Sequence, residues 1–178
     1  KTADPEAREK MHNASTMAGM AFANAFLGMS HSMAHKIGGV HHTVHGRTNA
    51  ILLPYVIRYN GTRPSKTTTW PKYNYWKADE KFQDIAKMLG LPHSTPEEAV
   101  EAYAKAVYDL GVAVGIKMNF KDQGIDEKAW KDSLHEIALL AYEDQCSPAN
   151  PRLPMVADME EIMADAYYGY AERPGRRK

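Results

Sequence analysis

The sequence predicts an all-α protein. Over most of the 178 residues, apolar side chains recur at intervals of three and four, which is the spacing of one face of an α-helix. No segment alternates apolar and polar residues as a half-buried strand does, and the glycines stand at the ends of helical patterns. We therefore expect a helical bundle, with one all-helical domain over residues 1–172 and a frayed tail at 173–178.

Three helices are expected in the first third of the chain. The first, over 5–26, has an apolar face made mostly of alanine and glycine, so that we expect it deep inside the bundle. A short second helix, "SHSMAHKIGG", is expected to end at Gly38 and Gly39, because glycine readily takes the left-handed conformation of a helix end. The loop "VHHTV" follows. The segment "HGRTNAILLPYVIRYNG" then resumes the apolar pattern, with Pro54 at a kink or in an early turn.

Four more helices are expected after an irregular connection at 62–76, which is rich in proline, threonine and aromatic residues. One helix ends at Gly90. The next begins with a capping box of Thr95 and Glu98 and has proline at its first position. The apolar positions that define the four helices are Phe82, Ile85, Ala86 and Leu89; Val100, Tyr103, Val107, Leu110 and Val114; Trp130, Leu134, Ile137 and Ala141; and Val156, Met159, Met163 and Ala166.

Composition excludes several classes of partner. Twenty-two basic and twenty-two acidic residues give no net charge, so that no global field favours nucleic acid or an anionic membrane surface. No run of about eighteen apolar residues is present to span a bilayer, and "KTADPEAREKMHN" lacks the apolar segment of a secretory signal. The only cysteine, Cys146, excludes an intramolecular disulfide and fits a reducing, cytoplasmic setting. The start at Lys1, directly before a helical pattern, suggests a cut point inside a larger polypeptide.

Five of the eight histidines stand within fifteen positions: His31, His35, His41, His42 and His45. The first two are four residues apart, so that their rings lie one turn apart on the same face of a helix. Small and apolar residues surround them, and buried imidazoles need partners. His45 opens the next helical segment, where its ring can point back toward the first pair. A metal site, an acid/base site and a polar surface loop all remain open at this point.

The sequence offers too few candidate ligands for a complete metal site. Two neutral imidazoles suit iron or zinc, but a catalytic metal usually has three or four protein ligands. The remaining histidines, His12, His93 and His135, stand in no H-E-x-x-H motif or acidic cluster, and we interpret them as surface or cap residues. His41 and His42 follow two glycines in the expected loop, which favours a solvent-exposed or nucleotide-proximal position over metal ligation.

The stretch "GMSHSMAHKIGGVHHTVHGRTNAILLP" resembles the signature of iron-containing alcohol dehydrogenases, H-x-M-A-H-x-x-G-G followed by H-G-x-x-N-A-x-L-L-P. The segments "VIRYN", "DQCSPANPR" and "YYG" resemble the carboxy-terminal alcohol dehydrogenase part of bifunctional aldehyde-alcohol dehydrogenases. The resemblance runs along almost the whole chain. It implies the C-terminal helical domain of these enzymes as the fold.

The resemblance also implies roles for single residues. His31 and His45 correspond to two metal ligands for Fe²⁺, with Zn²⁺ as the alternative ion. His35 corresponds to a catalytic and cofactor-binding residue near the nicotinamide and the substrate, and Cys146 to a residue near the cofactor. The family's other two ligands and its nucleotide-binding half have no counterpart here. Lys36 stands where relatives often have proline, which changes the local charge beside the cofactor.

The implied reaction is the interconversion of a short, acetaldehyde-like aldehyde and its primary alcohol with NAD. Its partners would be this small substrate, the missing N-terminal nucleotide-binding domain and further copies in a homo-oligomeric parent, with neither nucleic acid nor membrane. The chain alone is expected to be inactive. A non-catalytic helical packing and oligomerisation module is the alternative, and a helical domain with incidental surface histidines is a third interpretation.

Overall fold

A computed structural model describes residues 4–64 and 76–169 of the chain. Within these two ranges the regular structure is helical and contains no strand, which confirms the all-α prediction. The connection at 65–75 and the tail at 173–178 lie outside the described residues. No helix in the described part of the chain is both long and apolar enough to span a membrane. The elements are α1 (Pro5–Ala25), α2 (Met29–His41), α3 (His45–Gly61), α4 (Ala78–Met88), α5 (Pro96–Ala113), α6 (Glu127–Tyr142), the short 3₁₀ helix η2 (Ser147–Ala149) and α7 (Val156–Tyr168).

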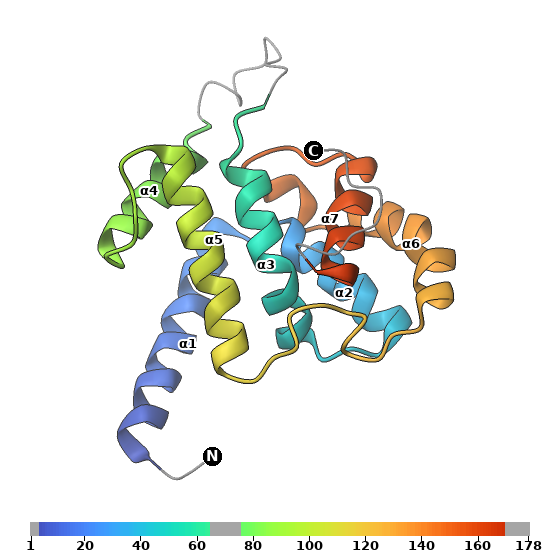
Figure 1. Ribbon diagram of the computed structural model, residues 1–178, viewed down its shortest axis with the longest axis horizontal. Coiled ribbons are helices and arrows are strands. Elements are labelled where there is room, and N and C mark those ends of the chain that lie inside the picture. The colour runs from blue at the N-terminus through green and yellow to red at the C-terminus, as the bar shows by residue number, and fades with distance from the viewer. Residues whose placement is uncertain (1–3, 65–75, 170–178) are drawn as a thin grey trace.

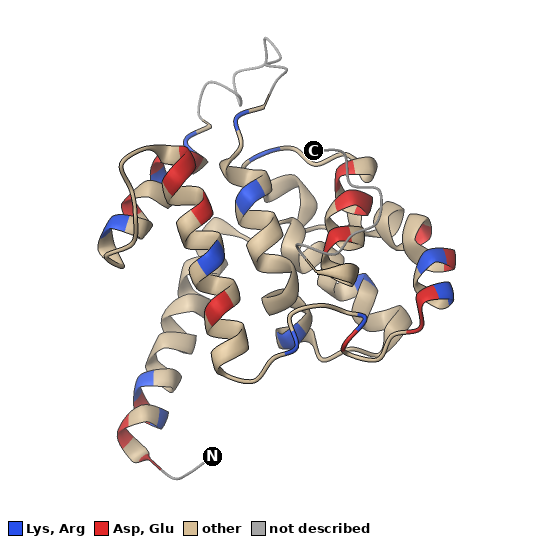
Figure 2. Cartoon of the chain, in the orientation of Figure 1, with Lys and Arg blue, Asp and Glu red and all other residues tan. Residues whose placement is uncertain are grey.

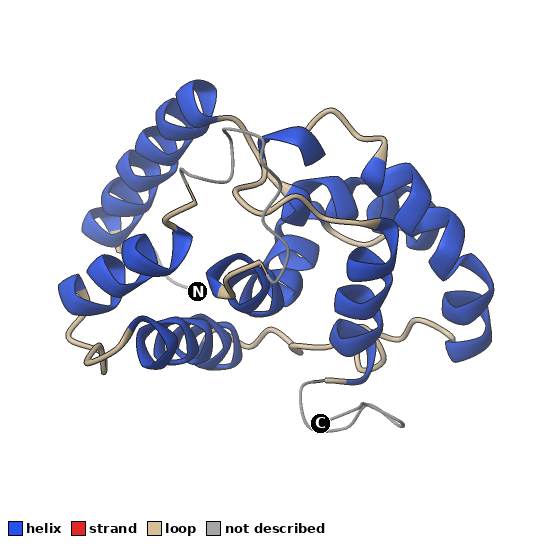
Figure 3. Ribbon diagram, turned by 90° about the horizontal axis from the view of Figure 1, so that it is seen from above, coloured by secondary structure: helices blue, strands red, loops and turns tan. Residues whose placement is uncertain are grey.

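Helix α3 lies at the centre of the fold, with α2, α6 and α7 on one side and α4 and α5 on the other (Figures 1 and 3). The larger side encloses the main core, and a smaller cluster around Ile57, Val100 and Ala104 joins α3 to α5. Because α3 packs on two sides, its apolar stretch is buried over more than one face. The largest buried side chains of the main core are Met29, Met33, Ile37, Ile51, Leu52, Phe120, Trp130, Ile137, Met159, Met163 and Tyr167.

Helix α1 lies outside the core, and the prediction that it would be deeply buried is wrong. Its start is as expected, since the Asp4 carboxylate accepts hydrogen bonds from two backbone amides of the first turn and Pro5 follows. None of its residues is buried, and Met11, Met17 and Met20 are 65–70% exposed. The helix extends away from the body, with charged residues only near its start (Figures 1 and 2). Small residues permit close packing, but the described residues place no helix against this face.

Helix α2 continues through Gly38 and Gly39, so the predicted end at these glycines is also wrong. It reaches His41 and ends at His42, which takes the left-handed conformation with φ 53°. A glycine inside a helix costs only about 1 kcal/mol relative to alanine. Ile37 is fully buried and the His41 ring packs on Trp130, and we attribute the continuation of the helix to these contacts. The loop before α3 is therefore shorter than predicted.

The later helices agree better with the predictions. The Thr95 hydroxyl caps α5 by accepting from the Glu98 N–H, while the Glu98 carboxylate accepts from the N–H of Ser94. Pro54 lies in the middle of α3 and is buried, rather than in its first turn. The apolar face predicted for α5 is buried only in part, because two of its residues are mostly exposed: Leu110 at 63% and Val114 at 66%.

Candidate metal centre

Three of the histidines come together where α2 and α3 meet. His31 and His35 lie one turn apart on α2, and His45 is the first residue of α3. The ring centroid of His45 is 5.3 Å from that of His31 and 5.3 Å from that of His35, and it stacks on the latter with 16° between the planes. The centroids of His31 and His35 are 6.2 Å apart. A helix-turn-helix of this kind presents several imidazoles to one small volume.

Packing on the opposite face of α2 orients the pair of histidines. Met29, Met33 and Ile37 are fully buried in the main core, so that the face with His31 and His35 points away from it. His31 is half-buried and His35 is exposed. The apolar positions of α2 therefore determine where its imidazoles lie.

Asn49 holds His45 and links the starts of the two helices. Its side-chain amide nitrogen lies 3.1 Å from Nε2 of His45, one turn earlier on α3, and its carbonyl oxygen accepts from the Ser30 hydroxyl at 3.0 Å. Nε2 accepts this hydrogen bond only while it carries no proton. An ion bound at Nε2 would take the place of the Asn49 amide.

His31 has the properties of a ligand that is ready to bind. Within residues 4–64 and 76–169 neither of its ring nitrogens makes a hydrogen bond. Burial, followed by the neighbouring His45 and His35, lowers the pKa of His31 below its usual value. The imidazole is therefore neutral near neutral pH, which is the form that binds a metal. His31 and His45 could therefore supply two of the three or four protein ligands of a catalytic metal.

Asp144, to which the sequence did not point, contacts His35 from the turn that follows α6. Its Oδ2 lies 3.2 Å from Nδ1 of His35 and 3.0 Å from Nζ of Lys36, and its Oδ1 accepts from the N–H of Cys146 at 3.0 Å. Burial alone would raise the pKa of Asp144, but the hydrogen bonds from Cys146, Lys36 and His35 hold it well below its usual range. The carboxylate is therefore ionised at any pH near neutrality.

Cys146 lies beside the same pair, in the turn between α6 and α7. It is 2% exposed, and its Sγ is within 4.8 Å of a His35 nitrogen and an Asp144 oxygen. Burial, together with Asp144, raises the pKa of the Cys146 thiol, which favours the protonated form. These three side chains could group around an ion, but the Lys36 ammonium already lies on Asp144. The positive charge of this ammonium would oppose a cation bound at the group.

His41 does not lie in the exposed loop in which it was predicted. It is the last residue of α2 and is half-buried, with its ring 5.3 Å from that of Trp130 and its Nε2 3.0 Å from the Ser133 hydroxyl. His42 is exposed, as expected. The other histidines, His12, His93 and His135, are exposed and confirm the surface interpretation.

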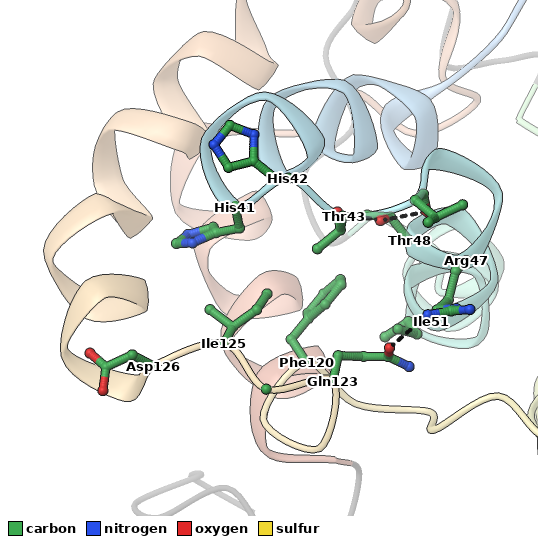
Figure 4. A pocket seen from close by; sticks show the side chains of 12 residues that line it. His41, His42, Thr43, Arg47, Thr48, Ile51, Phe120, Gln123, Ile125 and Asp126 are labelled. Carbon is green, nitrogen blue, oxygen red and sulfur yellow. Dashed lines mark hydrogen bonds between the residues drawn. The ribbon is translucent and has the colours of Figure 1, made fainter.

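A cavity of about 280 Å³ lies between the α2–α3 turn and the loop before α6 (Figure 4). Arg47 from α3 donates to the Gln123 side chain across it, while Phe120 and Ile125 form its apolar wall (Figure 4). His45 does not line this cavity, which is therefore distinct from the histidine cluster.

Comparison with known proteins gives matches over almost the whole chain. Residues 1–167 match the model of the Fe-containing alcohol dehydrogenase family, C-terminal. The chain is 79% identical over 178 residues to an aldehyde-alcohol dehydrogenase of Streptococcus pneumoniae, which covers all of this chain and 20% of that protein. It is 60% identical over 168 residues to aldehyde-alcohol dehydrogenase 2 of Entamoeba histolytica, with 94% of this chain and 19% of that protein covered.

A solved structure of a 1,3-propanediol oxidoreductase has the same fold, with a TM-score of 0.78 and 33% identity over 93% of this chain and 39% of that one. The chain spans about a fifth of the length of the two curated relatives. Since the family match extends over nearly all of its residues, the chain belongs to the Fe-containing alcohol dehydrogenase family and corresponds to its C-terminal helical region.

Proposed function

We propose that this chain is the helical half of an iron-dependent, NAD-linked alcohol dehydrogenase, which interconverts a short, acetaldehyde-like aldehyde and its primary alcohol. The convergence of His31, His35 and His45 in a chain of this family carries the proposal. The names of the relatives, which are aldehyde-alcohol dehydrogenases, support the substrate class.

His31 and His45 would hold the metal in this function. Their imidazoles suit Fe²⁺, with Zn²⁺ as the alternative ion, and the remaining ligands would come from a part of the protein outside this chain. Bound there, the ion supplies a Lewis acid for the carbonyl or alkoxide oxygen of the substrate. His31 supports this role because its nitrogens are unpaired in the described residues and its ring is neutral.

His35 would transfer the proton to or from the substrate oxygen. Reduction of an aldehyde adds a hydride to the carbonyl carbon and a proton to its oxygen, and oxidation of the alcohol reverses both steps. With Nδ1 of His35 on Asp144, the other ring nitrogen remains for proton transfer or for orienting the nicotinamide. Cys146, buried next to His35, would contribute to the wall of the cofactor site.

The test compares alanine variants of the three histidines in the full-length protein. His31→Ala and His45→Ala are expected to lose bound iron and activity. His35→Ala should keep its iron while turnover falls by about 100-fold or more, because it removes a proton-transfer group and no ligand. Iron per protomer and NADH-dependent acetaldehyde reduction are the measurements, and His93→Ala, at an exposed position, is the control. Stoichiometric iron in both ligand variants would overturn the proposal, and loss of iron in His35→Ala would make this residue a ligand.

The second candidate function is a helical packing and oligomerisation module without activity of its own. The exposed apolar side chains of α1, Met11, Met17 and Met20, favour it, because they offer a surface for another helix.

A further inference from the structure

We propose that Asp144 is a positioning residue for His35, which fixes the tautomer and the orientation of its ring, and that Lys36 balances the charge of this carboxylate. The inference rests on the proposed role of His35 in proton transfer. It assigns a function to a residue 109 positions further along the chain, outside the histidine-rich motif.

The hydrogen-bond geometry determines which nitrogen of His35 carries the proton. An ionised carboxylate only accepts hydrogen bonds, so that Nδ1, at 3.2 Å from Oδ2 of Asp144, must be the donor. The neutral ring then has its lone pair on Nε2. This is the arrangement in which a carboxylate holds an imidazole in one tautomer for proton transfer or metal chemistry.

Asp144 is itself held in place, as a positioning residue must be. Its side chain is 7% exposed, and its Oδ1 accepts from the backbone N–H of Cys146. His35 is exposed and contacts His45 by ring stacking, which does not select a tautomer. The buried carboxylate is therefore the contact that specifies the protonated nitrogen.

Lys36 gives the buried Asp144 carboxylate a cationic partner. Its ammonium lies 3.0 Å from Oδ2 of Asp144, the same oxygen that contacts Nδ1 of His35. The negative charge of the carboxylate is therefore balanced next to the imidazole. Lysine at this position thus acquires a specific role.

A double-mutant cycle in the full-length protein tests the proposal. Asp144→Asn retains the shape of the side chain and an oxygen for the Cys146 N–H, but its amide can donate to Nδ1 and so favours the other tautomer. We expect kcat to fall by about 10- to 100-fold while KM for the aldehyde and bound iron change by less than about twofold. In the His35→Ala background, the same substitution should change kcat by less than about twofold.

A second measurement does not depend on activity. In iron-free protein, diethyl pyrocarbonate modifies the unprotonated ring nitrogen, and mass spectrometry reports the rate at His35. Asp144→Asn should slow this modification severalfold, because Nε2 then carries the proton, while the rate at the exposed His93 stays unchanged. If Asp144→Asn does not fold, Asp144→Glu serves in both measurements, since it keeps the charge but displaces the oxygen from Nδ1.

The outcomes separate this inference from the proposed function. An equal loss of kcat with and without His35 would show that Asp144 acts only as a structural residue of its turn, and would overturn the inference. Unchanged turnover and unchanged modification of His35 in Asp144→Asn would also overturn it, provided that His35→Ala is impaired. Full turnover in His35→Ala would instead contradict the proposed role of His35.

Discussion

The half-buried imidazole of His41 makes the free energy of unfolding depend on pH. Burial, followed by the nearby His42, lowers the pKa of His41 below its usual value of 6.5. Between the lowered pKa and 6.5, the unfolded chain binds more protons at this position than the native protein does. Stability contributed by the neutral ring is therefore present above about pH 6.5 and decreases as the pH falls through this window.

The substitution His41→Phe tests this dependence, because phenylalanine can still pack on Trp130 but does not titrate. The free energy of unfolding should fall less steeply for the variant than for the native protein between about pH 7.5 and about pH 5.5. Urea denaturation at several pH values measures both slopes, with the exposed His93→Phe as the matched control. Parallel slopes for His41→Phe and the native protein would contradict the assignment of the pH dependence to His41.

The candidate site residues that could be predicted from the sequence are those that lie close together in the chain. His31, His35 and His45 lie within one motif: the first two are one helical turn apart, and the third opens the next helix. Asp144 could not be found in this way, because only tertiary packing brings the turn after α6 to α2. The environment of His41 was missed for the same reason, since Trp130 lies far away in the sequence.

Among the secondary-structure elements, α2 and α3 are held at their ends by the buried side chain of Asn150. Its Oδ1 accepts from the Met29 N–H at the start of α2 and from the Asn60 amide near the end of α3, both at 3.3 Å. Its own amide donates to Asn60 at 2.7 Å and to the carbonyl of Arg152 at 2.6 Å. A side chain at Gly28 would place Cβ only 2.7 Å from Asn150 Oδ1, which explains the glycine before α2.

Replacing Asn150 by alanine should therefore loosen the start of the helix that carries the candidate ligand His31. The substitution leaves the Met29 N–H and the Asn60 amide without these partners in a buried place, which we expect to cost about 2–3 kcal/mol of unfolding free energy. Denaturation in urea gives the value, and Asn13→Ala, at an exposed position on α1, is the control. A loss no larger than in Asn13→Ala would show that this network does not stabilise the fold.

Hydrophobic spacing predicted the positions of the helices better than their ends or their surroundings. The glycines after Ile37 were expected to end α2. The free energy that they cost inside a helix is small compared with the gain from burying Ile37, so that packing determines where the helix ends. For α1, periodicity identified the helix and its small-residue face. Periodicity does not reveal what covers such a face, and the described residues leave it exposed.

In the molecule as a whole, the described residues bring together only half of the proposed ligand shell. Two imidazoles, His31 and His45, face one volume, while a catalytic metal usually has three or four protein ligands. The separate group of His35, Asp144 and Cys146 has its carboxylate already paired with Lys36. The protein beyond this chain is therefore expected to determine metal affinity.

We expect the isolated 178-residue chain to bind Fe²⁺ at least about 100-fold more weakly than the full-length protein, and not to oxidise ethanol with NAD. Equilibrium dialysis with metal analysis measures the first quantity and NADH formation the second. Tight binding that Cys146→Ser abolishes would place the metal at the His35, Asp144 and Cys146 group, whereas tight binding lost in His31→Ala would mean that this chain alone completes a shell. Ethanol oxidation by the isolated chain would exclude the non-catalytic module, because a module of that kind supplies packing surfaces and no reaction.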